Sequence, residues 1–344
     1  MNARAFLLLL WPITASAQGF AGLGTDVDGF SSPQRPAEFD FPIDHGPHDD
    51  YRIEWWYLTA NLEGLDGTPY GLQWTLFRSA LTSDGGKGWS SPQLWMGHAA
   101  VTTPDAHFVT ERLARGGIGQ AGVQADPFEA WIDDWQLVGP DFATLTMTAS
   151  GPDFAYDMVL NSDGPLVFHG DEGYSLKSAE GQASYYYSQP FYAIEGTLIL
   201  PTGTIEVAGD AWLDREWSSQ PLSDNQTGWD WFSLSFEDGK LMGFRLRQTD
   251  GSDYTSATWI DPDGTTTSYS NSAFEAEPVA ISDIGGRDVP TTWNVRLADR
   301  GVDVEVTAIN PQAWMNTSVP YWEGPITVQG SHTGRGYLEM TGYD

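Results

Sequence analysis

Apolar and polar residues alternate with a period of two along much of this chain. Between residues 54 and 62 every second position is apolar, which places one face of an extended strand against a core; these positions are Trp56, Leu58, Ala60 and Leu62. No window of 12 or more residues has helical apolar spacing without a Gly or Pro. Short strand-like runs recur instead, at residues 144–149, 156–160, 197–200, 204–208 and 302–308. The pattern predicts an all-β, antiparallel sandwich or barrel.

Two hairpins share one plan. The first runs from residue 54 to 78 and reverses near Asp66-Gly67, and the second runs from residue 229 to 247 and reverses at Asp238-Gly239. Each opens with aromatic residues and ends in Arg, and they lie about 175 residues apart. We interpret this as an internal duplication of one β-domain; the alternative is a chance likeness of aromatic hairpins. The predicted domains are residues 40–200 and 201–344, after an N-terminal arm at 18–39.

Counting residues outward from each hairpin turn predicts two cross-strand acid–arginine pairs. The first turn places Glu54 opposite Arg78, and a two-residue turn at Asp238-Gly239 places Asp230 opposite Arg247. Such a pair at the mouth of a barrel could tether a lid or form the polar end of a ligand pocket. The alternative is a partly exposed ion pair worth under about 1 kcal/mol.

Charge and cysteine content exclude several classes of protein. The chain has 47 acidic and 16 basic residues, a net charge of −31, which would repel nucleic acid and an anionic membrane face. It has no Cys, so disulfides, thiolate metal sites and Cys nucleophiles are excluded. Nucleic acid is therefore not an expected partner.

The N-terminus resembles a signal peptide. A basic residue, Arg4, precedes a short apolar run, and Ala15-Ser16-Ala17 forms a small-residue cleavage site. We predict a signal peptide at residues 1–17, cleavage after Ala17 and a periplasmic or secreted protein; the alternative is a buried N-terminal helix. No stretch reaches 18 apolar residues, so no membrane span is expected.

The densest candidate for chemistry is the segment at residues 212–217. In a strand, Asp214 and Glu216 share one side, and Arg215 and Trp217 the other. Two buried carboxyl groups could act as acid and base, and the alternative is a structural ion-pair cluster. His98 lies among small and apolar residues, which suits a buried, hydrogen-bonded His or a catalytic one. Two segments near the C-terminus resemble the last strands of a barrel, and they contain Glu323 and Glu339 as possible polar groups of a site.

Familiar catalytic and cofactor motifs are absent from the sequence. It has no G-x-S-x-G elbow, Walker loop, G-x-G-x-x-G or H-E-x-x-H. His45 and His48 lie near carboxylates, but the Gly-Pro between them makes the segment a loop, and a metal site is the lesser of two interpretations. We expect no cofactor and no metal.

These segments together resemble the family of carotenoid 1,2-hydratases (CrtC, hydroxyneurosporene synthase) and AttH-like proteins, some of them labelled secreted hydrolases. The resemblance extends from about residue 40 to the C-terminus. The matching residues are Phe41-Pro42, Asp44-His45-Gly46, His48, Glu54-Trp55-Trp56-Tyr57, Gln73, Thr75, Phe77-Arg78, Met96-Gly97-His98-Ala99-Ala100, Tyr185-Tyr186-Tyr187-Ser188, Trp212-Leu213-Asp214-Arg215-Glu216-Trp217, Gly228-Trp229-Asp230-Trp231, Tyr321-Trp322-Glu323-Gly324, Gly336-Tyr337, Glu339 and Thr341-Gly342-Tyr343.

The resemblance implies two lipocalin-like antiparallel β-barrels side by side, with a pocket for a hydrophobic small molecule. The hydratase branch adds water across an isoprenoid double bond, without a cofactor, and has a His where this chain has Arg215. An Arg stays protonated and cannot donate that proton, so Arg215 would suit an anionic or carbonyl group on a ligand instead.

Three functions remain open at this point. The first is an exported protein that binds a hydrophobic or amphipathic small molecule through Arg215, Trp217, Trp229, Trp231, Glu54, Trp56 and Arg78. The second is a hydrolase or hydratase-like lyase with Asp214 or Glu216 as the acid and His98 assisting. The third is carbohydrate binding through exposed Trp. Association with an export or ABC transporter system is left undecided.

Overall fold

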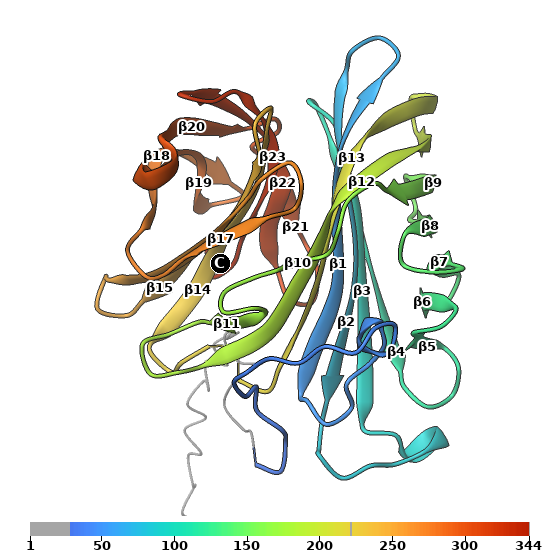
Figure 1. Cartoon of the computed structure of the whole chain (residues 1–344). Helices are drawn as coiled ribbons and strands as arrows, with labels where there is room; N and C mark the ends of the chain where they lie inside the picture. Colours follow the sequence, from blue (N-terminus) through green and yellow to red (C-terminus); the bar gives the residue numbers. More distant parts are fainter. Residues whose placement is uncertain (1–27, 221, 344) are drawn as a thin grey trace, which may run out of the picture.

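The computed structural model describes residues 28–220 and 222–343, and shows two antiparallel β-sheets side by side (Figure 1). The predicted all-β class is confirmed. Each sheet curls into a barrel-like domain, consistent with the lipocalin-like fold that the resemblance implied. The predicted signal peptide lies outside the described residues. Among the residues that are described, no helix has the length and apolar character that crossing a membrane requires.

The first sheet has 13 strands within the described residues. Along its main path they follow the order β4-β3-β2-β1-β13-β12-β9-β8-β7-β6-β5, with β10 and β11 paired to β12. The strands are β1 (Ile53–Gly64), β2 (Pro69–Ala80), β3 (Gln93–Thr102), β4 (His107–Arg115), β5 (Ala121–Gln124), β6 (Phe128–Ile132), β7 (Trp135–Gly139), β8 (Thr144–Ser150), β9 (Ala155–Ser162), β10 (Val167–Phe168), β11 (Tyr174–Leu176), β12 (Ala183–Leu200) and β13 (Gly203–Ser218). Short 3-10 turns are η2 (Ile43–His45) and η3 (Gly88–Ser90).

In the described part of the chain the second sheet has 10 strands, in the order β17-β16-β15-β14-β23-β22-β20-β19-β18, with β21 paired to β22. The strands are β14 (Gln226–Phe236), β15 (Lys240–Gln248), β16 (Asp253–Ile260), β17 (Thr266–Tyr269), β18 (Phe274–Ile284), β19 (Arg287–Leu297), β20 (Val302–Ala308), β21 (Trp314–Met315), β22 (Tyr321–Gly330) and β23 (Gly334–Met340). A 3-10 turn, η4 (Ala298–Arg300), precedes β20.

The two sheets repeat one topology. In the first sheet, β1 to β4 are neighbours in chain order, and β1 also pairs with β13, the last strand of that sheet in the chain. In the second sheet, β14 to β17 are neighbours in the same way, and β14 also pairs with the last strand, β23. This equivalence is what the predicted duplication requires. The predicted boundary at residues 200 and 201 falls in the turn between β12 and β13, whereas the chain passes from one sheet to the other between Ser218 and Gln226. The reason is that β13 pairs with β1 and so belongs to the first sheet.

The alternating pattern correctly assigns the inward face of the first hairpin. Trp56 and Leu58 lie in the core that the first sheet encloses, and Phe232 and Leu234 lie in the second. A third apolar cluster, which includes Tyr57, Tyr186, Trp231 and other residues of both sheets, lies between the two domains. The outward faces of the two first strands are therefore also buried, against each other.

The two predicted acid–arginine pairs have different outcomes. Glu54 lies opposite Arg78, as predicted. Asp230 lies opposite Arg245, so the prediction of Arg247 is wrong. The turn is one residue earlier than Asp238-Gly239, because Ser235 pairs with Lys240. Arg247 still forms an ion pair with Asp230, reaching it diagonally.

Candidate functional site between the two sheets

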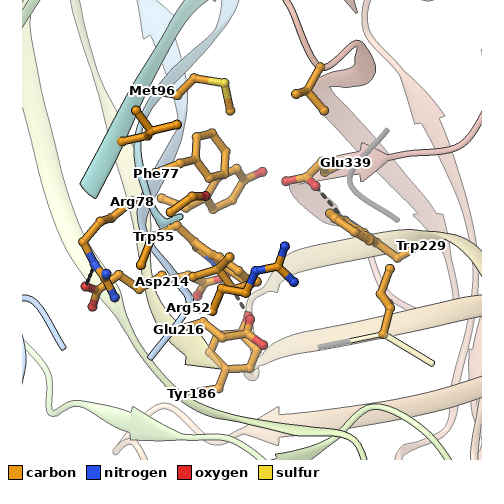
Figure 2. Close-up of a pocket in the computed structure, with 18 of the residues that line it drawn as sticks. Arg52, Trp55, Phe77, Arg78, Met96, Tyr186, Asp214, Glu216, Trp229 and Glu339 are labelled. Atoms are coloured by element: carbon orange, nitrogen blue, oxygen red, sulfur yellow. Dashed lines mark hydrogen bonds and ion pairs between the residues drawn. The ribbon is translucent and has the colours of Figure 1, made fainter. Parts of the chain in front are cut away.

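A cavity of about 420 Å³ lies between the outer faces of the two sheets. Its walls come from β1, β2, β3 and β13 on one side and from β14, β15 and β23 on the other (Figure 2). Most of the lining is apolar and includes Trp55, Phe77, Met96, Trp231, Phe244 and Leu246. A site of this kind, apolar with a few convergent polar groups, suits a small organic molecule.

Strand alternation explains which residues reach the cavity. Trp55 and Tyr57 point outward from β1 and line the cavity, while Trp56 between them is buried in the barrel core. In β13 the same rule sends Asp214 and Glu216 to the cavity. These two carboxyl groups therefore share one side of the strand, as predicted.

Asp214 accepts three hydrogen bonds at the cavity wall. Tyr186 Oη and Trp212 Nε1 each donate to its carboxyl group at 2.6 Å, and Ser188 Oγ donates as well. Burial raises the pKa of Asp214 to about 7, although the three hydrogen bonds work against that rise. Asp214 can therefore hold or release a proton near neutral pH.

Glu216 is already engaged within the protein. Its Oε1 lies 2.8 Å from Lys177 Nζ and accepts a hydrogen bond from Ser184 Oγ. The Lys177 ammonium also lies over the rings of Tyr186 and Phe244, at 4.8 and 4.3 Å from their centroids. This buried ion pair leaves Glu216 less free than Asp214 to exchange a proton with a ligand.

A second pair of acids comes from the other sheet. Glu339 in β23 lines the cavity and accepts a hydrogen bond from Trp229 Nε1 at 2.6 Å; Figure 2 shows this pair across the cavity from Asp214. Burial raises the pKa of Glu339 to about 7, and the nearby Asp214 and Glu216 charges add to the rise. Glu323 is the cross-strand neighbour of Glu339. Burial, followed by repulsion from Glu339, also raises the pKa of Glu323 well above its ordinary value.

Three of the predicted ligand residues lie inside the first barrel instead. Arg215, Trp217 and Trp56 belong to its interior and do not line the cavity. Arg215 donates to the backbone carbonyls of Trp55 and Gly46, at 2.9 and 2.7 Å, and its guanidinium lies 3.9 Å from the Trp56 ring centroid. Both terminal nitrogens of Arg215 thus have partners within the protein, whereas its Nε is buried without a hydrogen bond.

Glu54 joins Arg215 to Arg78. One carboxylate oxygen pairs with Arg78 Nε, and the other lies 3.2 Å from Arg215 Nη2. Burial alone would raise the pKa of Glu54, but Arg78, His48 and Arg215 hold it far below its usual range. Glu54 and Arg78 form part of the cavity wall, so they separate the barrel interior from the cavity.

The histidine candidates also lie away from the cavity lining. His98 lies at the contact of the two sheets, with Nδ1 3.0 Å from Tyr321 Oη and Nε2 3.1 Å from Glu111. Burial lowers its pKa, so it is neutral at pH 7. His48 stacks on Trp217 and contacts Asp44 and Glu54. Across residues 28–220 and 222–343, no group of three or more His, Cys, Asp or Glu side chains is arranged to hold a metal ion.

The cavity is also lined by residues to which the sequence assigned no site role, among them Arg52, Lys177 and Tyr186. Tyr186 lies opposite Glu216 in the β12–β13 pairing, so a correct register would have placed it on the outward face. Arg52 and Lys177 lie just outside the strands β1 and β11, where alternation gives no signal. By contrast, Trp229 and Trp231 were predicted and do line the cavity.

The fold and cavity define a protein of two barrel-like β-domains with a small-molecule-sized cavity between them. A family model described as AttH-like matches residues 32–343, nearly all of the described chain. The chain belongs to the AttH-like family, as the sequence resemblance implied. No curated protein matches it.

Solved structures share the fold. A candidate AttH protein from Nitrosomonas europaea has 32% identity and a TM-score of 0.83, over 91% of this chain and 99% of that one. Kievitone hydratase from Nectria haematococca has 13% identity and a TM-score of 0.66, over 91% and 96% of the two chains. CghA, solved with Sch210972, has 13% identity and a TM-score of 0.52, over 85% and 88%.

Proposed function

We propose that this protein binds a hydrophobic or amphipathic small molecule in the cavity between its two sheets and catalyses a hydratase-like proton-transfer reaction on it. The observation that carries the proposal is Asp214, a buried carboxyl group with a pKa of about 7 at the wall of an apolar cavity. A general acid works best when its pKa is close to the operating pH. Export from the cell remains part of this proposal, on the strength of the signal-peptide pattern.

The chemistry follows from two acids on opposite walls. Protonated Asp214 donates its proton to one carbon of an electron-rich double bond, and water adds to the other carbon. Glu339, as a carboxylate, takes the proton that the water loses. The product is an alcohol, Asp214 is left ionised and Glu339 protonated, and proton exchange with solvent restores both. The reverse sequence is a dehydration.

Several features support a lyase over a hydrolase. The polar groups described at the cavity wall are acids, tyrosines, cations and Ser79, and no histidine among the described residues lines the cavity to serve as a base for that serine. A protein named as a hydratase shares the fold at low identity, so the fold is compatible with this chemistry. The acid of the proposal is Asp214, because Glu216 is paired with Lys177.

Simple ligand binding without turnover is the second candidate. The apolar wall favours it, and it needs only the cavity. Carbohydrate binding has less support, because Trp229 and Trp231 face the inter-sheet space instead of forming an open stacking surface.

The test begins with the small molecules that copurify with the protein, identified by mass spectrometry. Each is incubated with the wild type and with Asp214→Asn in H₂¹⁸O. A hydratase places ¹⁸O in an alcohol product, and the variant forms none while still binding the molecule. Binding without any labelled product would support the second candidate, and full turnover by Asp214→Asn would remove Asp214 from the mechanism.

A further inference from the structure

Arg52 is a cation at the cavity wall without an anionic partner. It directly precedes β1, and its backbone N–H donates to Ser219 Oγ at 3.2 Å. Its side chain lines the cavity and, in Figure 2, extends into the space between Asp214 and Trp229. Nη1 is buried without a hydrogen bond, and no ion pair to Arg52 is found in the described part of the chain.

The absence of an ion pair at Arg52 is unusual for a chain with so many acidic residues. Most other described arginines form ion pairs: Arg78 and Arg215 share Glu54, and Arg245 and Arg247 share Asp230. A buried guanidinium nitrogen without an acceptor costs free energy that the folded protein alone does not recover. Because the Arg52 side chain lines the cavity, an anionic ligand bound there would supply the counter-charge that the protein does not.

The other charges around the cavity leave the Arg52 charge uncompensated. Glu216 is offset by Lys177, and Glu54 is held by Arg78 and Arg215. At about pH 6, below their pKa of about 7, most of the Asp214 and Glu339 carboxyl groups are protonated and carry no charge. At that pH the cavity combines a largely apolar wall with the positive charge of Arg52.

We infer that the ligand is an amphipathic anion whose carboxylate binds the Arg52 guanidinium while its apolar body lies along the wall formed by Trp55, Phe244 and Leu246. A guanidinium presents a planar fork of N–H donors that matches the two oxygens of a carboxylate. The inference rests on the proposed function only in using the same cavity. The anchoring role that the sequence suggested for Arg215 passes to Arg52.

The experiment measures equilibrium binding of two probes, decanoate and decanol, by calorimetry at about pH 6, where decanoate is ionised. The proteins are the wild type, Arg52→Gln and Arg52→Lys. Arg296→Gln is the matched control, because it removes the same charge from an exposed site on the second sheet. We expect Arg52→Gln to weaken decanoate binding at least tenfold and to leave decanol binding unchanged, while the control behaves as the wild type. Arg52→Lys, which keeps the charge but not the fork, should lie between.

The outcomes separate the two proposals. Equal decanoate affinity of the wild type and Arg52→Gln would overturn the role of Arg52 and leave the cavity proposal standing. Failure of both probes to bind the wild type would overturn the apolar cavity as the binding site. Decanol binding also shows whether each variant is folded, and if Arg52→Gln does not fold, the comparison of Arg52→Lys with the wild type decides.

Discussion

Glu216 in β13 and Glu339 in β23 occupy equivalent positions in the two sheets. Glu216 is the cross-strand partner of Trp55, and Glu339 is the partner of Trp231. Both line the shared cavity, but Glu216 is paired with the Lys177 ammonium and Glu339 with the neutral indole of Trp229. The repeated topology thus places two like acids face to face, with different partners that give them different chemistry.

Turnover should depend on the protonated form of Asp214. For a substrate identified as described above, we expect kcat/KM to fall as the pH rises through about 7, because the acid loses its proton there. Asp214→Asn should lower kcat/KM by about 100-fold or more, within the usual range for general acid catalysis, without a matching loss of affinity. Asp157→Asn, an exposed change in β9, is the control. A flat pH profile in the wild type would contradict this role.

Tyr186 should tune the acid. Its hydroxyl donates a hydrogen bond to Asp214 and so lowers the pKa of that carboxyl group. We therefore expect Tyr186→Phe to raise the pKa of Asp214 above about 7. Infrared titration of the protonated carboxyl band, assigned by its loss in Asp214→Asn, measures the shift, and Tyr70→Phe in the first core is the matched control. An unchanged or lower midpoint would mean that this hydrogen bond does not stabilise the carboxylate.

The cavity acids should make the protein less stable as the pH rises. A carboxyl group whose pKa is raised on folding contributes stability that is full below its unfolded pKa and is lost as the pH rises through its folded pKa. For Asp214 this window runs from about 4 to about 7. Between pH 5 and 8 the free energy of unfolding, measured with urea, should therefore decrease less for Asp214→Asn than for the wild type. The two decreases should differ by about 3 kcal/mol at most. Identical pH slopes would show that Asp214 does not titrate in this window.

His45 has the opposite effect on the pH dependence of stability. Burial lowers its pKa to about 3, with a further contribution from Arg215. Its stabilising effect is present above its unfolded pKa, near 6.5, and is lost as the pH falls toward 3. Comparison of variants, instead of the wild-type curve alone, therefore isolates the effect of Asp214.

Arg215 should matter for stability and not for the ligand. Its removal leaves the buried Glu54 with one fewer compensating cation and frees two backbone carbonyls. We expect Arg215→Met to lower the free energy of unfolding by about 3–5 kcal/mol and to leave decanol affinity unchanged. Arg112→Met, at a partly exposed ion pair, should cost less than about 1 kcal/mol. Loss of decanol binding by a folded Arg215→Met would restore the ligand role that the sequence suggested.

The sequence was sufficient for the fold and for part of the site. A period of two identified which face of β1 holds Trp56 and which holds Tyr57, and a hairpin count placed Glu54 opposite Arg78. The same alternation separated Asp214 and Glu216 from Arg215 and Trp217. These successes share one cause, because each depends only on the local geometry of a strand.

The remainder depended on how the sheets pack. Alternation distinguishes the two faces of a strand but not what each face meets, so Arg215 was assigned to a ligand when its partners are Glu54 and backbone carbonyls. Asp230 was paired with Arg247 because the turn begins one residue earlier than the Asp-Gly signal suggests. Arg52 precedes a strand, where no periodicity marks it.

The most direct test of the central claim is a crystal structure of the protein with bound decanoate. We predict electron density for its alkyl chain between β1 and β13 of the first sheet and β14 and β15 of the second, within reach of Asp214 and Glu339. Density inside either barrel, beside Trp56 or Phe232, with the space between the sheets empty, would contradict the account.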